Sequence, residues 1–373
     1  MDLSPPQRHQ ELRDGLSALL ASHAASARDA PDSSGPRDAP GLWADLVSGG
    51  WVTFGFPEAS GGRGGGIGDL VVVAETLGGG HGATPFQGGI VLCGQALLTT
   101  SGEGDRLRAL LAGERTFTYC NWEGFEDPGA IPSTVEAAET ANGWALDGSA
   151  RFVPYADVVD ELLVLADVPA GGERRGPTLF AVPGSSSGLT LQSVPTVGGD
   201  HYSHVRFSRV EVDATQVVGQ VGGAMQWLPR VLDIGRVVLA AEMVGAAAAA
   251  LSHATHWATT RVQFNAPIGS FQAVQHRLAD AYIDVVTAQD SVYDAAGLID
   301  RGEGARLAAA AAKAYCADAC RRVTAAAHQM CGGEGIYADQ PLHWWHRRVA
   351  ALVPVLGSVR YLHAIVATSV LSD

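Results

Sequence analysis

The chain has 373 residues, of which 47% are apolar and 17% charged, so it can bury an extended core over two or three domains. Its 25 basic and 39 acidic residues give a formal charge of −14, which argues against a protein that follows the phosphates of a nucleic acid. The first six residues contain no basic segment followed by an apolar core, so we expect no secretory signal.

The first third of the chain is predicted to be helical. Residues 1–22 place leucines largely on one side of an amphipathic helix, whereas residues 24–40 are rich in Ala, Ser, Asp and Pro and predict a mobile loop. From residue 42 onward, helical patterns alternate with glycine-rich turns. We therefore expect an N-terminal α-helical domain over residues 1–112.

Residues 113–220 have a different pattern, with short runs rich in β-branched or aromatic residues. Turn pairs such as Asn142-Gly143 and Pro183-Gly184 bound these runs. The pattern predicts a middle β-domain of several strands. The runs are 116–119, 144–146, 161–165, 178–182 and 204–212, the last alternating with period two.

Residues 221–373 are again helical in pattern. Long periodic stretches with few breakers predict helices over 241–258, 271–300 and 305–330. The longest apolar run contains Glu242 and is too short and too rich in alanine for a membrane span, so a buried helix is the better interpretation. The pattern of the whole chain therefore predicts an α+β fold, with a helical region, then a β-domain, then a bundle similar to a four-helix bundle.

Cysteine and histidine spacings indicate neither a disulfide framework nor a metal site. The five cysteines cannot all pair and no CxxC spacing occurs, so we expect reduced thiols in a cytoplasmic protein. Three pairs of histidines are three residues apart, but none has a third ligand at metal spacing.

The strongest motif is the segment RVQFNAPIGSFQ, from Arg261 to Gln272, which joins two of the long predicted helices. Pro267 and Gly269 favour a turn there. The guanidinium of Arg261 and the amide of Gln272 suit a pyrophosphate or another phosphate ester. The alternative is an ordinary turn between helices with a surface arginine.

A second motif, QMCGGEG, closes the next long helix between Gln329 and Gly335. Three glycines in four residues permit positive φ and a close approach of the backbone to a ligand. Glycines also end helices in general, so this motif alone is weak evidence.

The order and separation of the two motifs resemble those of the flavin-dependent acyl-CoA dehydrogenase family, and the resemblance extends over nearly the whole chain. It includes residues 51–62 (WVTFGFPEASGG), 75–78 (ETLG), 119–123 (YCNWE) and 151–154 (RFVP). The resemblance implies an N-terminal helical domain, a middle β-barrel domain and a C-terminal four-helix bundle that clasp FAD between subunits. It also implies dehydrogenation of the α,β-bond of an acyl thioester, in which a carboxylate takes the α-proton and the flavin takes the hydride.

By this resemblance, two strand segments line the flavin ring and two helix-end motifs reach the cofactor of a neighbouring subunit. Such sharing implies an obligate oligomer. The implied ring contacts are Tyr119, Asn121, Trp122, Glu123, Phe152, Val153 and Pro154, with Ser358 as a further flavin contact. The implied contacts to the pyrophosphate, adenine and ADP half are Arg261, Gln263, Phe264, Gln272, Gln329, Gly332 and Gly333.

The chain departs from the family at the catalytic base. The glutamate of the family corresponds to Leu356, and the alternative base position, just before an arginine, corresponds to Gly235. Neither residue can accept a proton. The family's flavin-strand threonines correspond to Trp122 and Pro154, and proline offers no N–H donor.

Other carboxylates are possible replacement bases. Glu242 follows Gly235 by seven residues, or two helical turns of about 10 Å, which is too far for direct substitution. Its alternative interpretation is a glutamate paired with an arginine. Glu123 and Asp233 are no better supported, and Arg236 is expected to contact either substrate or Asp233. The segment WWHRR, from 344 to 348, is explained by core packing and a surface arginine pair.

Three functions are compatible with these observations. The first is a flavoprotein subunit paired with a different, base-bearing acyl-CoA dehydrogenase chain, as in family heteromers that act on bulky, steroid-like acyl-CoA. The second is a homo-oligomer with altered chemistry on a CoA-bound or carrier-bound substrate, such as a relocated base, an oxidase or a monooxygenase, in a natural-product pathway. The third is a structural subunit without its own flavin.

Overall fold

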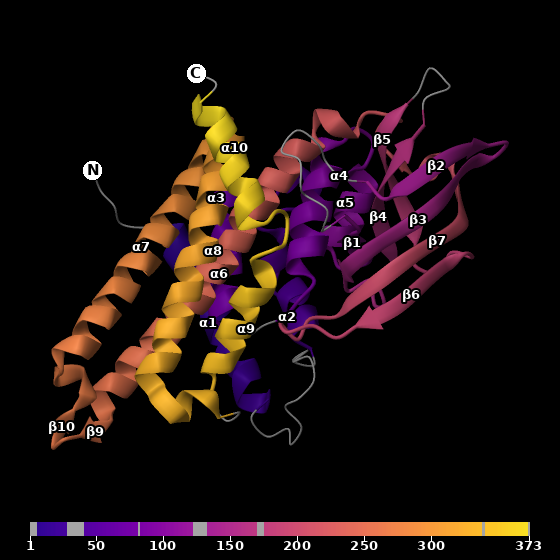
Figure 1. The fold of residues 1–373 in the computed structure, drawn as a ribbon. Helices are drawn as coiled ribbons and strands as arrows, with labels where there is room; N and C mark the ends of the chain where they lie inside the picture. Colours follow the sequence, from indigo (N-terminus) through magenta and orange to yellow (C-terminus); the bar gives the residue numbers. More distant parts are fainter. Residues whose placement is uncertain are drawn as a thin grey trace.

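The computed structural model describes residues 6–27, 41–80, 83–121, 133–169, 175–337 and 340–371, with the side chains of 24–27 left out. Helices from both ends of the sequence pack together, and one eight-stranded sheet lies at one side of the molecule (Figure 1). The expected order of helical, β and helical regions is confirmed. The exact boundaries after residues 112 and 220 stay predictions.

Helices of the N-terminal region form where leucine and valine recur with helical spacing. They are α1 (Gln7–Ala27), α2 (Leu42–Ser48), η1 (Trp51–Thr53), η2 (Glu58–Ser60), α3 (Ile67–Gly79), η3 (Phe86–Gly94), α4 (Gln95–Thr99) and α5 (Gly104–Leu111). Leu12, Leu16 and Leu20 are buried on the inner side of α1, as predicted.

Helix α1 is longer than the sequence pattern predicted. It continues to Ala27, so the prediction of a loop from residue 24 is wrong for residues 24–27. Alanine is the strongest helix former, and no proline interrupts the chain before Pro31. The rest of the predicted loop, 28–40, lies outside the described residues.

The strands are β1 (Phe117–Tyr119), β2 (Val135–Thr140), β3 (Gly143–Pro154), β4 (Glu161–Val168), β5 (Gly176–Pro183), β6 (Leu189–Val194), β7 (Tyr202–Asp213) and β8 (Val217–Val218). All five predicted strand runs are confirmed, whereas β2, β6 and β8 were missed. The hydrogen-bonded order is β6-β7-β3-β2-β4-β5-β8, with β1 paired to β4. Within the described ranges, β6 and β8 at the two ends of this order do not pair with each other.

Residues on the two faces of the sheet belong to different cores. Phe117, Leu163 and Leu179 join one large core with the helices, while Val135, Leu146 and Phe207 form a second core on the other face. Period-two alternation produces this division because successive strand residues point to opposite faces. One face of the sheet is therefore fixed against the helices.

The C-terminal elements are α6 (Leu228–Thr260), β9 (Val262–Gln263), β10 (Ala266–Pro267), α7 (Gln272–Arg301), α8 (Ala305–Cys331), η7 (Gly332–Ile336), α9 (Leu342–Leu352) and α10 (Val359–Leu371). Short turns η4 (Ala214–Gln216), η5 (Ala224–Gln226) and η6 (Ile268–Ser270) complete the chain. Helix α6 is long and apolar enough to cross a membrane, but 89% of its most apolar window is buried inside the protein. The prediction of a buried core helix is therefore confirmed.

Candidate functional site

Gly235 and Leu356, the two positions where the sequence resemblance placed a base, lie together in the structure. A Cβ atom added to Gly235 would be 2.8 Å from Leu356 Cδ1 and 2.5 Å from Leu92 Cδ2. Leu356 and Leu92 are buried. The two sequence positions therefore share one site, and apolar side chains fill it.

Arg236, next along α6, fixes the segment that carries Leu356. Its Nε donates to the carbonyl oxygen of Leu356 at 2.9 Å, and its Nη2 lies 3.4 Å from the hydroxyl of Tyr361. Leu356 is held in the left-handed region at φ 56°, which is unusual for a branched residue. The buried Arg236 side chain thus holds this loop in place by hydrogen bonds. A contact between Arg236 and substrate stays a prediction.

Asp233 forms an ion pair with the same arginine, Arg236. Its Oδ1 lies 2.6 Å from Arg236 Nη1, and both side chains are about 95% buried. Burial raises the pKa of the Asp233 carboxyl, and the attraction of Arg236 opposes this rise. Because the carboxylate is already paired, Asp233 is a poor replacement base.

Glu242 is paired as well, as its alternative interpretation expected. Arg348 on α9 donates to both Glu242 and Asp200, and Gln87 Nε2 donates to the other Glu242 oxygen at 3.0 Å. The prediction that Arg348 is a surface arginine is wrong, since its side chain is only 15% exposed. Burial lowers the pKa of Arg348, but Asp200 and Glu242 outweigh it and raise this pKa well above its usual range. Asp200 and Glu242 are far from Arg348 in the sequence, so no local pattern could predict that they would be its partners.

The strand segments expected to line a flavin ring lie beside each other. Thr118 Oγ1 donates to the carbonyl oxygen of Pro154 at 2.7 Å, which links β1 to the end of β3. Asn121 is buried, and its Oδ1 accepts from the backbone of Leu165 at 3.1 Å. Tyr119 is buried, and burial raises the pKa of its hydroxyl. Trp122 and Glu123 lie outside the described residues.

A bulge shapes the end of β3. The pairing with β7 shifts between Ala150 and Val153, and Phe152 has a φ of 53°. Its ring is 41% exposed and lies 5.0 Å from the ring of His204, edge to face, while Val153 is buried. Bulges of this kind re-aim side chains beside functional sites. Pro154, which follows, has no N–H to donate to a ligand.

The segment from Arg261 to Gln272 forms the predicted turn between α6 and α7, built as a β9–β10 hairpin. Phe264 at its tip is 89% exposed and, with Asn265, has positive φ. The Phe264 ring lies 6.2 Å from that of Phe271, and the Arg261 guanidinium lies over Trp257 at 5.6 Å. Gln263 and Gln272 are exposed. An exposed aromatic ring and exposed guanidinium suit an adenine and a phosphate brought by another chain.

The glycine motif ends α8 as predicted. Gly332 has φ 59° and ψ −137°, a conformation that only glycine adopts readily. A Cβ atom on Gly332 or Gly333 would meet nothing within 4 Å, so a ligand has room to approach, and Gln329 is exposed beside them. Ser358 directly precedes α10, and its Oγ accepts from Tyr361 N at 3.2 Å. The flavin contact expected of Ser358 stays a prediction.

The two sets of expected cofactor residues lie far apart on one chain. Figure 1 shows the β9–β10 hairpin at the lower left end of the helical bundle and β1 and β3 on the other side of the molecule. One cofactor could contact both sets only if two chains contributed. The free space beside Gly332 and Gly333 and the exposed hairpin fit the nucleotide half of FAD. Near the expected flavin ring, Pro154 has no backbone N–H, so this position offers one hydrogen-bond donor fewer than another residue would.

Sequence reasoning missed Lys313, which lies wholly buried in α8. Its Nζ donates to the carbonyl oxygens of Leu352 and Val353 at 3.1 and 3.0 Å, at the end of α9. Burial lowers the pKa of Lys313 from 10.5 to about 7. Lys313 is the only lysine in the chain and follows a run of alanines, a signal that could have identified it.

Comparison with known proteins identifies this architecture. Residues 6–110 match the family description "acyl-CoA dehydrogenase, N-terminal domain", and residues 223–371 match "acyl-CoA dehydrogenase, C-terminal domain". The chain belongs to the acyl-CoA dehydrogenase family. It is thus an oxidoreductase of the type that acts on CH–CH bonds, and members of the family are FAD-binding flavoproteins.

Individual members of the family support this assignment over most of the chain. Acyl-CoA dehydrogenase FadE27 of Mycobacterium tuberculosis is 31% identical over 81% of this chain and 80% of its own. The crystal structure of the ChsE4–ChsE5 complex from Mycobacterium tuberculosis superposes with a TM-score of 0.88 and 26% identity over 100% of both chains. The Tcur3481–Tcur3483 steroid ACAD superposes with a TM-score of 0.85 and 27% identity over 98% of both.

Proposed function

We propose that this chain is a subunit of a hetero-oligomeric acyl-CoA dehydrogenase, in which a different chain carries the base. The proposal rests on the contact between Gly235 and Leu356. These are the two expected base positions, they lie side by side, and neither residue has a group that can accept a proton. The buried carboxylates of Asp233 and Glu242 are held by Arg236 and Arg348. Since neither of these two described carboxylates is free, a proton acceptor supplied by a partner is the source that we propose.

The separation of the two sets of expected cofactor residues supports sharing of FAD between two chains, and the empty base positions favour unlike chains. The chain would offer its hairpin and its Gly332–Gly333 turn to the nucleotide half of a flavin bound mainly by the partner. Bound FAD supplies the hydride acceptor, while the residues of this chain hold and orient it. The names ChsE4–ChsE5 and Tcur3481–Tcur3483 each pair two proteins, which favours such an arrangement.

Exposed apolar side chains support the binding of a partner at the end of the bundle that carries the hairpin and the Gly332–Gly333 turn. Large apolar side chains that stay exposed mark interaction sites when they are contiguous. Phe264, Ile336 and Tyr337 are between 58% and 89% exposed, and they belong to the hairpin, to the end of η7 and to the residue that follows η7. Further exposed members are Val262, Phe271, Tyr282 and Ile283.

The proposed substrate is an acyl thioester, bound to CoA or to a carrier protein, and oxidised at its α,β-bond. The resemblance to a steroid ACAD favours a bulky polycyclic acyl group. In this chain, Arg236 would hold the Leu356 loop in place without taking a proton. A cytoplasmic location stays a prediction.

The test is co-expression with the acyl-CoA dehydrogenase chains encoded by neighbouring genes, followed by counting FAD per assembled complex. We expect one FAD for each pair of unlike chains and bleaching of the flavin by acyl-CoA only in the complex. Replacing the partner's base by glutamine should abolish bleaching, whereas the matched change Leu356→Gln in this chain should leave it intact. Bleaching by this chain alone would contradict the proposal and favour a homo-oligomer with altered chemistry. A colourless complex would favour a structural subunit.

A further inference from the structure

A pocket of about 540 Å³ lies between α1, α3, α6 and α7, outside the site described above. Gly245 and Ala248 line its α6 wall, ten and thirteen residues beyond Gly235. At 1.5 Å per residue, this is about 15–20 Å along the helix, so the pocket is separate from Gly235. Its volume is within the usual range of about 300–1,000 Å³ for small-molecule sites.

Glycines keep the floor of the pocket at backbone level. A Cβ atom on Gly245 would overlap the carbonyl oxygen of Glu75, and one on Gly78 would overlap that of Glu242. Helices α3 and α6 therefore cross in direct backbone contact. Gly79 and Gly80 end α3 just beyond the crossing and also line the pocket, so no side chain fills this space.

One end of the pocket is polar but electrically balanced. Glu75 accepts from Arg13 Nη2 at 3.0 Å, from the Tyr293 hydroxyl at 2.7 Å and from Gln289 Nε2 at 2.5 Å. The Glu75 side chain is only 10% exposed. The positive charge of Arg13 is thus neutralised, and either an anion or a cation bound here would lack a counter-charge.

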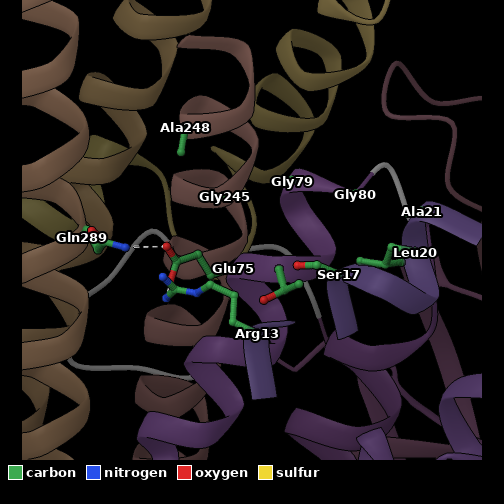
Figure 2. A pocket seen from close by; sticks show the side chains of 11 residues that line it. Arg13, Ser17, Leu20, Ala21, Glu75, Gly79, Gly80, Gly245, Ala248 and Gln289 are labelled. Atoms are coloured by element: carbon green, nitrogen blue, oxygen red, sulfur yellow. Dashed lines mark hydrogen bonds and ion pairs between the residues drawn. The ribbon is translucent and has the colours of Figure 1, made fainter. Parts of the chain in front are cut away.

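Hydrogen-bonding groups at this end are still free for a ligand. In the part of the chain that the structure describes, Arg13 bonds only through Nη2, which leaves its Nε and Nη1 free, and Ser17 Oγ has no protein partner. Figure 2 shows Gln289, Glu75 and Arg13 toward one side of the pocket and Leu20 and Ala21 toward the other. The pocket therefore pairs a polar, neutral end with an apolar end.

We propose that this pocket binds an uncharged, elongated apolar molecule that carries one hydroxyl or carbonyl group. The apolar body would lie against Leu20, Ala21 and the Gly79–Gly80 backbone, and the oxygen would accept from Arg13 or bond to Ser17. Burying a charged group at the same place without a counter-ion is strongly unfavourable. The proposal does not depend on the proposed function.

Isothermal titration of the full chain with octanol, octanoate and octylamine tests the inference. We expect saturable binding of octanol, with octanoate and octylamine at least tenfold weaker. Ser17→Trp fills the pocket and should weaken octanol binding at least tenfold. The matched change Ala18→Trp, at an exposed residue of α1 that does not line the pocket, should leave binding unchanged.

Removal of the balancing charge provides a second readout. Glu75→Gln leaves Arg13 without a counter-ion, so the variant should bind octanoate at least tenfold more tightly than the wild type does. If this variant fails to fold, the Ser17→Trp and Ala18→Trp pair still decides the outcome. The proposal is overturned if octanol does not bind saturably, if Ser17→Trp binds it as well as Ala18→Trp does, or if the wild type prefers octanoate.

Discussion

Leu356 Cδ1 lies directly over Gly235, so close that a single methyl group on the glycine would reach to within 2.8 Å of it. The two residues are 121 positions apart in the sequence and belong to a long helix and to the loop before α10. By the sequence resemblance, the family places its base at one or the other position, and the structure brings these two positions of this chain together. In this chain that point is apolar.

Introducing a carboxylate at this point should create proton abstraction. We expect Leu356→Glu, in the complex with a partner whose own base is replaced by glutamine, to raise exchange of the α-proton of bound acyl-CoA in deuterated water at least tenfold. The nearby Arg236 guanidinium would stabilise the new anion. Leu356→Gln is the matched control, because it has the same shape and cannot take a proton. Equal exchange in both variants would contradict the prediction.

The crossing of α3 and α6 should tolerate no side chain. Gly245→Ala should lower the free energy of unfolding by at least about 2 kcal/mol, because the new methyl group overlaps the Glu75 backbone. The control is Gly79→Ala, where the nearest atom would be 3.5 Å away and the change should stay within about 1 kcal/mol. Chemical denaturation measures both, and similar losses in the two variants would show that the crossing is not close.

Arg348 should be essential for stability even though it lies outside the flavin residues. Arg348→Met leaves Asp200 and Glu242 as two buried carboxylates without their cation, a loss of about 3–5 kcal/mol. Arg347→Met, at the next and exposed residue, should change stability by less than about 0.5 kcal/mol. Urea titrations compare the two variants, and a negligible difference between them would exclude the buried triad.

Lys313 should make stability depend on pH in an unusual direction. Its pKa is lowered to about 7 in the folded chain and is near 10.5 when unfolded, so between these values the unfolded chain binds more protons. Stability should therefore rise with pH from about 7 to 10, by up to about 1.4 kcal/mol per pH unit. Below pH 7 the full penalty for the buried ammonium is present.

The lone lysine allows a direct measurement. Carbon-13 label at lysine Cε reports only Lys313 and should titrate near pH 7. The difference in unfolding free energy between the wild type and Lys313→Met isolates this group from the tyrosines and cysteines. A titration near 10.5, or a difference that does not change between pH 7 and 10, would refute the assignment.

The exposed hairpin should affect assembly without affecting the fold of the chain. Phe264→Ser removes a ring that is 89% exposed, so the unfolding free energy of the isolated chain should change by less than about 0.5 kcal/mol. Affinity for the base-bearing partner should fall at least tenfold, as for an aromatic interface anchor. Analytical ultracentrifugation of the mixed chains measures this, and unchanged assembly would place the interface elsewhere.

The sequence by itself determined the order of helices and strands, the turn at Arg261–Gln272 and the end of α8 at Gly332. These features are local, because periodicity, proline and glycine act over a few residues. Given the family resemblance, the sequence also showed that Leu356 and Gly235 stand where a carboxylate was expected. Only the tertiary structure showed that these two residues meet, that Arg348 lies between Asp200 and Glu242, and that Lys313 caps α9. Such pairings join residues about 40 to 150 positions apart, and close packing of the folded chain, not any local pattern, decides them.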